Sequence, residues 1–255
     1  MNERELETVR GGILYDPSKV GKPAETLFSE AYWRDAGGIE RRAAGRGSVA
    51  FLKAGAERWV WRHYHRGGLM ARLLGDRYLY TGADRTRAYC EFRLLVRLTE
   101  LDLPVPAPVA ARYERAAIGL YRADLITVEL PPTVTLADAI TGRDLEADRW
   151  ETVGATIARF HAAGIQHADL NAHNVLLSTD APSGRACDVY LLDFDRGRLR
   201  ERGAWEADVL ARLQRSLEKI ATQRADACYH ARDWQALMRG YEAADESFSK
   251  APVVS

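Results

Sequence analysis

The sequence lacks a net charge, because 36 Lys and Arg residues balance 36 Asp and Glu residues. A molecule without a net field does not attract nucleic acid as a whole, so an anionic partner must be held by local patches of positive charge. Nucleic acid is therefore not expected among the partners. Hydrophobic residues make up 47% of the 255 residues, enough to bury the core of one large domain or of two lobes that share a cleft.

Cysteine is also scarce, and long apolar runs are missing. The three cysteines, Cys90, Cys187 and Cys228, are odd in number, lie far apart and form no Cys-x-x-Cys pair. This usage predicts free thiols in a reducing cytoplasm. No apolar run approaches the roughly 18 residues of a membrane-spanning helix, and residues 1–7 are charged where a signal peptide is apolar. We therefore expect a protein that is neither exported nor inserted across a membrane.

The most informative stretch is HADLNAHN at residues 167–174, which runs into the apolar segment VLL. Within it Asp169 precedes Asn174 by five residues, and a second apolar segment further on ends at Asp193. In phosphoryl transfer from ATP, a carboxylate accepts the proton of the attacking hydroxyl, while amide and carboxylate oxygens hold Mg²⁺. The spacing predicts Asp169 as the base and Asn174 and Asp193 as metal ligands.

Two alternating runs joined by small residues predict a β-hairpin in the first part of the chain. Gly45 and Gly47 precede it, and glycines there let backbone N–H groups approach phosphate oxygens, although many such glycines serve turn geometry alone. Alternation along the second strand places Val60 and Arg62 on one face. From there Arg62 would reach the phosphates of a nucleotide whose base lies against Val60; Lys53 is the alternative cation.

A helix is expected over 84–101, where apolar residues recur at helical spacing until several prolines end it. Glu91 lies on the edge of the inward face of this helix. A carboxylate in that position is costly unless it is paired, and Arg62 is its natural partner. The alternative is a solvated Glu91 that has no part in a site.

Further strands complete a β-rich first part, and the remainder of the sequence is mainly helical. We therefore divide the chain into a lobe of residues 1–130 and a lobe of residues 131–255. The connection between them contains Glu129 and Leu130, whose backbone groups are expected to line an adenine pocket.

Helices in the second lobe are predicted from Thr135, over 148–164 and from Trp205. Between the last two, residues 196–202 contain four arginines. Such a run is usually a solvated face, yet beside a phosphoryl-transfer centre it also suits an acceptor that carries carboxylates or phosphates. The arginines nearest the proposed centre are Arg196, Arg198 and Arg200.

The chain resembles the protein-kinase-like superfamily, and within it the bacterial lipopolysaccharide kinases. The resemblance rests on HADLNAHNVLL, LLDFDRGR, the segment from Trp59 through RHYHRGG, and the helix containing Glu91. The resemblance implies an α+β, bilobal fold with a small, mostly antiparallel β N-lobe and a mainly helical C-lobe. It also implies that Arg62 and Glu91 form the ion pair that positions phosphates. Ala168 and Asp195 depart from the H-R-D and D-F-G patterns, and no A-P-E element is recognisable, so a protein substrate is not expected.

The resemblance further implies an enzyme that uses ATP and Mg²⁺ to phosphorylate a hydroxyl of 3-deoxy-D-manno-octulosonic acid (Kdo), by family likeness the 4-hydroxyl, on a lipid A precursor. An acceptor anchored in lipid implies a peripheral protein at the cytoplasmic face of the inner membrane. Two other interpretations stay open. One is an aminoglycoside-type or other small-molecule kinase, and the other is a pseudokinase that serves as a binding module.

Overall fold

The computed structural model describes residues 3–21, 25–42, 49–65, 75–116, 119–179 and 188–250. The chain forms two compact units. The first contains Met1–Glu100 and Pro106–Glu129, and the second contains Leu101–Val105 and Leu130–Ser255. The five residues Leu101–Val105 thus group with the second unit, although they lie well before residue 130 in the chain.

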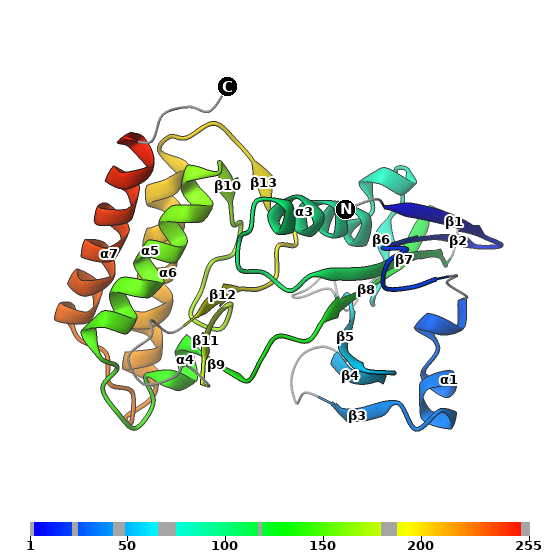
Figure 1. Ribbon diagram of the computed structural model, residues 1–255, viewed down its shortest axis with the longest axis horizontal. Coiled ribbons are helices and arrows are strands. Elements are labelled where there is room, and N and C mark those ends of the chain that lie inside the picture. Colours follow the sequence, from blue (N-terminus) through cyan, green and yellow to red (C-terminus); the bar gives the residue numbers. More distant parts are fainter. Residues whose placement is uncertain are drawn as a thin grey trace. The chain divides into compact units, whose positions relative to one another are not determined.

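An antiparallel sheet of eight strands forms the centre of the first unit (Figure 1). Seven of its strands follow the order β1-β2-β7-β8-β5-β4-β3, and β6 pairs with β8. The strands are β1 Arg4–Thr8, β2 Gly11–Tyr15, β3 Ile39–Arg42, β4 Val49–Ala54, β5 Glu57–His63, β6 Tyr78–Leu79, β7 Pro108–Arg115 and β8 Leu120–Val128. The predicted hairpin is confirmed, since β4 pairs with β5 in antiparallel register.

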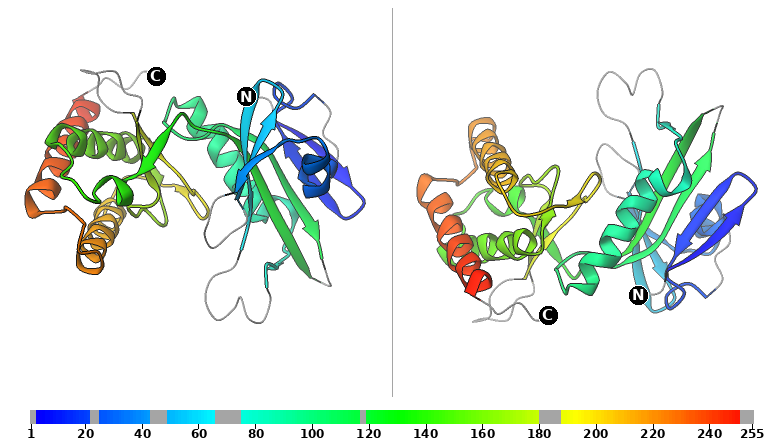
Figure 2. Two further views of the ribbon diagram at one scale, coloured as in Figure 1. Left: turned by 90° about the horizontal axis from the view of Figure 1, so that it is seen from below. Right: turned by 90° about the horizontal axis from the view of Figure 1, so that it is seen from above.

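Helix α3, Arg87–Glu100, lies along one face of this sheet, preceded by the short helix η2, Ala83–Arg85 (Figure 2). Its apolar residues recur at helical spacing, and Phe92, Leu95 and Leu98 are buried against the sheet. The register places Arg62 opposite Leu125, and Leu125 opposite Ala111. Because side chains alternate along a strand, these three residues share the face that α3 covers.

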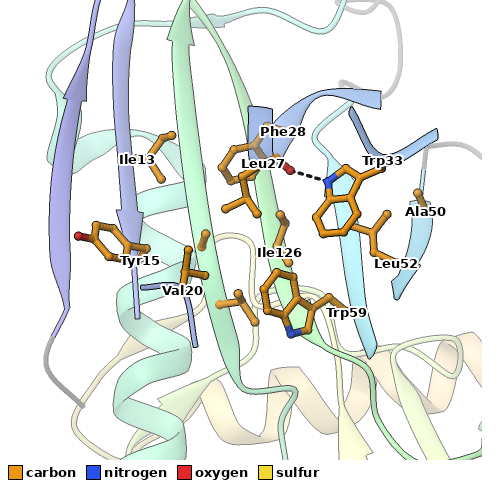
Figure 3. Packing of buried hydrophobic residues seen from close by; sticks show 12 residues of the cluster. Ile13, Tyr15, Val20, Leu27, Phe28, Trp33, Ala50, Leu52, Trp59 and Ile126 are labelled. Carbon is orange, nitrogen blue, oxygen red and sulfur yellow. Dashed lines mark hydrogen bonds between the residues drawn. The ribbon is translucent and has the colours of Figure 1, made fainter. Parts of the chain in front are cut away.

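The opposite face of the sheet carries a second hydrophobic cluster, shown in Figure 3. It is covered by the short helices η1, Glu25–Phe28, and α1, Glu30–Asp35, which contribute Phe28 and Trp33. The Trp33 indole N–H donates to the Leu27 carbonyl at 2.8 Å. The sequence predicts one helix over 24–35, whereas the structure has two short ones, because Ser29 is extended and caps α1.

The second unit is mainly helical, and Figure 1 shows its three long helices together. Two small sheets complete it: β9, β11 and β12 pair in one, and β10 pairs with β13 in the other. The helices are α4 Leu136–Ala139, α5 Ala147–Ala162, α6 Trp205–Gln223 and α7 Ala231–Lys250; the strands are β9 Thr133–Thr135, β10 Ile165–Gln166, β11 Val175–Ser178, β12 Val189–Leu191 and β13 Arg198–Leu199.

Helices α5 and α7 approach each other closely because each has a glycine at the contact. A methyl group added to Gly154 would overlap the Leu237 carbonyl oxygen, and one added to Gly240 would overlap the Glu151 carbonyl oxygen. Only glycine permits backbones to come this near. These two helices therefore form one rigid support on which the neighbouring α6 and the loop after α5 are built.

The predicted helix starts are correct at one position and wrong at another. Thr135 caps α4 as expected, since its hydroxyl oxygen accepts the N–H of Asp138 at 3.0 Å. The longer helix begins one residue before the predicted Asp148, and its N-cap, Glu146, makes no side-chain capping bond. Its end is as predicted: Gly164 adopts φ 70°, a conformation that a β-carbon disfavours.

Candidate active site

The loop between β10 and β11 is held by a buried histidine. His167 is 2% exposed; its Nε2–H donates to the Leu192 carbonyl at 2.8 Å, and its Nδ1 accepts the N–H of Asp169 at 3.2 Å. Burial lowers the pKa of His167, which agrees with a neutral ring that donates at one nitrogen and accepts at the other. His167 therefore orders the loop and is not available as a base.

Asp169 lies two residues after His167, and 58% of its side chain is exposed. Its backbone is fixed on both sides, because its carbonyl accepts the side-chain amides of Asn171 at 2.9 Å and Asn174 at 3.0 Å. One carboxylate oxygen, Oδ1, lies 3.0 Å from Nη1 of Arg212 on α6. The carboxylate thus stands on a rigid backbone and remains open to an acceptor from solvent.

Asn174 and Asp193 are joined through the backbone. The carbonyl of Asn174 accepts the N–H of Leu192 at 2.9 Å, so the residue before Asp193 is hydrogen-bonded to the end of the catalytic loop. Asn174 uses its Nδ2 for the Asp169 carbonyl, which leaves the amide oxygen as its remaining group for a cation. An amide oxygen beside a carboxylate is a donor set that fits Mg²⁺.

The turn around Asp193 has an unusual backbone. Asp193 adopts φ 63° and Arg196 adopts φ 73°, conformations that side chains rarely take outside special turns. Phe194 anchors the turn, because its buried ring stacks on Phe160 of α5 with centroids 5.7 Å apart and lies 4.8 Å from the His167 ring. The core of the second unit therefore sets where Asp193 points.

In the first unit, the predicted ion pair between Arg62 and Glu91 is present. Arg62 on β5 places Nη2 at 2.5 Å from Oε2 of Glu91 on α3, and the hydroxyl of Tyr64 donates to the same oxygen at 2.5 Å. Glu91 is 3% exposed, whereas the Arg62 side chain is 26% exposed. Arg62 also lies over the Tyr64 ring, 4.7 Å from its centroid. The Arg62 side chain is therefore less deeply buried than its partner Glu91.

The other predicted nucleotide contacts have different outcomes. Val60 shares the face of Arg62, since it lies two residues before it on β5. The N–H of Glu129 donates to the Arg58 carbonyl at 2.8 Å, so the backbone group that this residue could offer to adenine is its carbonyl. Leu130 is the first residue of the longer segment of the second unit. Gly45 and Gly47 lie outside the described residues.

The arginine run does not act as one cluster. Arg196, Arg198 and Arg200 are exposed, and β13 places Arg198 opposite Gln166. Arg200 donates from Nη1 to the Gln166 side chain at 3.3 Å. Arg202, by contrast, pairs with Glu206 at 2.8 Å and with Asp245 at 2.7 Å, so it ties α6 to α7. All four arginines are thus exposed, and Arg202 is the one engaged in ion pairs between helices.

Sequence reasoning misses three side chains that meet these residues. Tyr64 contacts Glu91, Arg212 contacts Asp169, and Ser216 Oγ accepts the N–H of Ala172 at 3.2 Å. Arg212 and Ser216 lie one turn apart on α6, about forty residues beyond the loop in the chain. Helical spacing identifies both as polar positions, but no local pattern shows that this face meets the catalytic loop.

Two features are absent from the residues that the structure describes. No group of three or more His, Cys, Asp and Glu side chains in this part of the chain is arranged to hold a metal ion. No helix there is both long enough and apolar enough to cross a bilayer.

Within the first unit, a cavity of about 600 Å³ beside α1 is lined by residues that include Trp33, Lys53 and Trp59, and its lining does not include Arg62 or Glu91.

Comparisons with known proteins agree on one family. Residues 30–241 match the model of the Lipopolysaccharide kinase (Kdo/WaaP) family. Proteins named 3-deoxy-D-manno-octulosonic acid kinase from Xylella fastidiosa strain M12 and Stenotrophomonas maltophilia strain R551-3 are each 42% identical to this chain, over 236 and 241 residues, which cover 92% of this chain and 90% of each relative.

A solved structure supports the fold. The structure of WaaP in complex with acyl carrier protein aligns with a TM-score of 0.53 at 21% identity, and the match covers 84% of this chain and 82% of that one. The sheet-rich first unit and the helical second unit belong to the same α+β arrangement. The kinase-like fold class expected from the sequence is thereby confirmed.

Proposed function

The chain belongs to the lipopolysaccharide kinase (Kdo/WaaP) family and is a phosphotransferase of lipopolysaccharide synthesis, and on that premise we propose its acceptor and its catalytic residues. The acceptor is Kdo on a lipid A precursor, and the phosphorylated group is the 4-hydroxyl. The phosphate comes from ATP, and transfer is direct, because positioning and charge neutralisation supply most of the catalysis in such reactions.

Asp169 is the proposed base. The observation that carries this assignment is the exposed carboxylate on a backbone held by His167, Asn171 and Asn174. A base must keep its place while an acceptor hydroxyl approaches from solvent, and this arrangement meets both needs. The carboxylate would take the hydroxyl proton as the oxygen attacks the γ-phosphorus.

Asn174 and Asp193 would hold Mg²⁺, which supplies charge neutralisation to the phosphates of the nucleotide. Arg62 would contact those phosphates, with Glu91 and Tyr64 setting its orientation. The planar fork of an arginine offers two parallel donors to phosphate oxygens, whereas a lysine offers a point charge. Gly45, Gly47 and Val60 would cover the nucleotide, and Glu129 and Leu130 would lie beside its base.

The exposed Arg196, Arg198 and Arg200 would meet the carboxylates and phosphates of the acceptor. Because this acceptor is anchored in lipid, the protein would work as a peripheral enzyme at the cytoplasmic face of the inner membrane. A cationic aminoglycoside is a poor match for three exposed arginines beside the site. This charge favours the Kdo acceptor over the aminoglycoside-type alternative.

The proposal is tested by incubating the full chain with ATP, Mg²⁺ and a Kdo-bearing lipid A precursor and then locating added phosphate by tandem mass spectrometry. We expect a single phosphate on Kdo with the wild type. Asp169→Asn should lower turnover by about 10² to 10⁴-fold, the range for a general base, with nucleotide affinity retained. Asp208→Asn, an exposed position on α6, is the matched control.

Each alternative has its own outcome in the same experiment. Phosphate on an aminoglycoside and none on the glycolipid would identify a small-molecule kinase. ATP binding without transfer to either acceptor would identify a pseudokinase. Turnover of Asp169→Asn near that of the wild type would remove Asp169 from the mechanism while leaving the substrate assignment intact.

A further inference from the structure

Helix α6 contacts the catalytic loop at two points that lie one turn apart. Arg212 pairs with the Asp169 carboxylate at 3.0 Å, and Ser216 accepts the N–H of Ala172 at 3.2 Å. Ala172 is buried, and its carbonyl accepts the N–H of Ala137 at 3.0 Å, so the loop is held from α4 as well. The guanidinium beside the proposed base is therefore held in place by the fold.

The pair is open to solvent, which distinguishes it from a structural ion pair. The side chains of Arg212 and Asp169 are 50% and 58% exposed, whereas Glu91 in the first unit is 3% exposed. An exposed ion pair contributes little to stability, typically less than about 1 kcal/mol. The small contribution of this ion pair to folding stability therefore does not explain why an arginine lies beside Asp169.

Arg212 also has N–H donors that do not contact Asp169. Its Nη1 faces Asp169, and among the described residues no other partner of its guanidinium is found. An arginine has five N–H donors in a rigid fork that matches a carboxylate. The edge that does not face Asp169 can accept a second carboxylate, which would then lie within a few ångströms of the base.

Resting on the proposed Kdo acceptor, we propose that Arg212 binds the carboxylate of Kdo and so determines which hydroxyl meets Asp169. In Kdo the carboxyl carbon is three bonds from the carbon that bears the 4-hydroxyl. Three carbon–carbon bonds of about 1.5 Å span at most about 4.5 Å. One guanidinium in contact with both carboxylates would therefore hold the carbon that bears the 4-hydroxyl close enough for that hydroxyl to reach Asp169. Neutral sugars lack this group, so the same contact selects for an acidic sugar.

The test is a cycle in which the enzyme and the acceptor are each changed once. The acceptors are the Kdo-bearing lipid A precursor and its carboxamide, which keeps the shape and the hydroxyls but loses the negative charge. The variants are Arg212→Ala and Arg212→Lys, with Arg215→Ala, an exposed arginine on the same helix, as the control. Steady-state constants for acceptor and for ATP are measured with each combination.

We expect Arg212→Ala to lower kcat/KM for the natural acceptor by about 10- to 100-fold, the effect of losing hydrogen bonds to a charged group, mainly through the KM for acceptor. The wild type should lose a similar factor on the carboxamide, and Arg212→Ala should lose little more on that acceptor. Arg212→Lys should recover part of the loss, and Arg215→Ala should behave as the wild type on both acceptors.

Independent, multiplying losses from the two changes would overturn the proposal, because they would show that Arg212 does not contact the carboxylate. So would a loss confined to the KM for ATP. If the Arg212 variants turn over the Kdo acceptor as fast as the wild type, this inference is wrong but the proposed function stands. If the wild type does not phosphorylate any Kdo glycolipid, the proposed function is wrong as well. Unchanged ADP–Mg²⁺ binding and thermal unfolding of Arg212→Lys establish that the fold is intact.

Discussion

Asp124 is the residue whose substitution tests the packing of the first unit most directly. It lies on β8, is 1% exposed, and accepts hydrogen bonds from Trp61 at 3.0 Å, His63 at 2.8 Å and Arg112 at 2.7 Å. Two of these donors are cationic. In Asp124→Asn the negative charge is lost. The NH₂ group of the new side chain also faces N–H groups of the neighbouring side chains, with which it cannot form hydrogen bonds.

The magnitude follows from the burial of these groups. Removing one partner of a buried ion pair costs about 3–5 kcal/mol, because the other charge stays buried. Here the side chains of Arg112 and His63 are 20% and 18% exposed, so water recovers part of this cost. We expect Asp124→Asn to lower the free energy of unfolding of the first unit by about 3 kcal/mol, within that range.

The loss should depend on pH in a stated direction. Burial alone would lower the pKa of His63, but the hydrogen bonds and charges of Asp124 and Asp76 outweigh it and raise the pKa above 6.5. The His63 contribution is therefore fully present below pH 6.5 and is lost as the pH rises through the raised pKa.

The carboxylate behaves in the opposite sense. Burial alone would raise the pKa of Asp124, yet His63 and Arg112 lower it below 3.8. Its contribution is present above pH 3.8 and is lost as the pH falls through the lowered pKa. The difference between wild type and Asp124→Asn should thus be greatest between pH 4 and 6.5, and smaller on the alkaline side once His63 is neutral.

The assay is a urea titration at pH 5.5, 7 and 8.5 read by pulsed hydrogen exchange and mass spectrometry. Peptides from β5 and β8 report the first unit, and peptides from α5 and α6 give an internal reference. A loss of about 3 kcal/mol corresponds to a midpoint shift of about 1–3 M urea. Asp84→Asn, at a carboxylate whose side chain is 78% exposed, is the control. A shift no larger than that of the control, or one that is constant over this pH range, would refute the reasoning.

Three further outcomes are expected. Arg62→Ala and Glu91→Ala should each weaken nucleotide binding, and because the two residues form one pair, the double variant should lose less than the sum; strict additivity in a binding titration would contradict this. Asn174→Ala should raise the Mg²⁺ concentration needed for half-maximal turnover, so an unchanged Mg²⁺ titration would exclude it as a ligand. Gly154→Ala should destabilise the second unit by about 1–3 kcal/mol through overlap with α7, while Gly203→Ala, at an open position, should not; equal urea midpoints would disprove the close contact.

Local chemistry in the sequence was enough to locate the centre of the proposed site. Asp169 and Asn174 could be selected from their spacing alone, whereas the hydrogen bonds by which His167 and Asn174 order the loop of residues 167–174 are seen in the structure. Strand alternation was enough to place Val60 and Arg62 on one face of β5. The pairing of Arg62 with Glu91 was also predictable, because a buried carboxylate at that point of a helix requires a cation.

Irregular and long-range features were not predictable in this way. The first hairpin, β1 and β2, has few sequence signals, since its strands depend on pairing with β7 for their stability. The hydrogen bond from the Glu129 N–H to the Arg58 carbonyl was not foreseen either, because it depends on where the chain meets β5. Both features depend on which strands pair in the folded sheet, and the local sequence does not specify that pairing.

The amino-acid sequence by itself indicated the helices and strands through short-range patterns of polarity, and it indicated the fold class and the family through its resemblance to the lipopolysaccharide kinases. Only the tertiary structure decided that Arg212 stands beside Asp169, that Asp124 lies between His63 and Arg112, and that α5 and α7 meet at glycines. These contacts join residues far apart in the chain. They exist because packing a hydrophobic core brings particular helix and strand faces together, and no local pattern encodes which faces will meet.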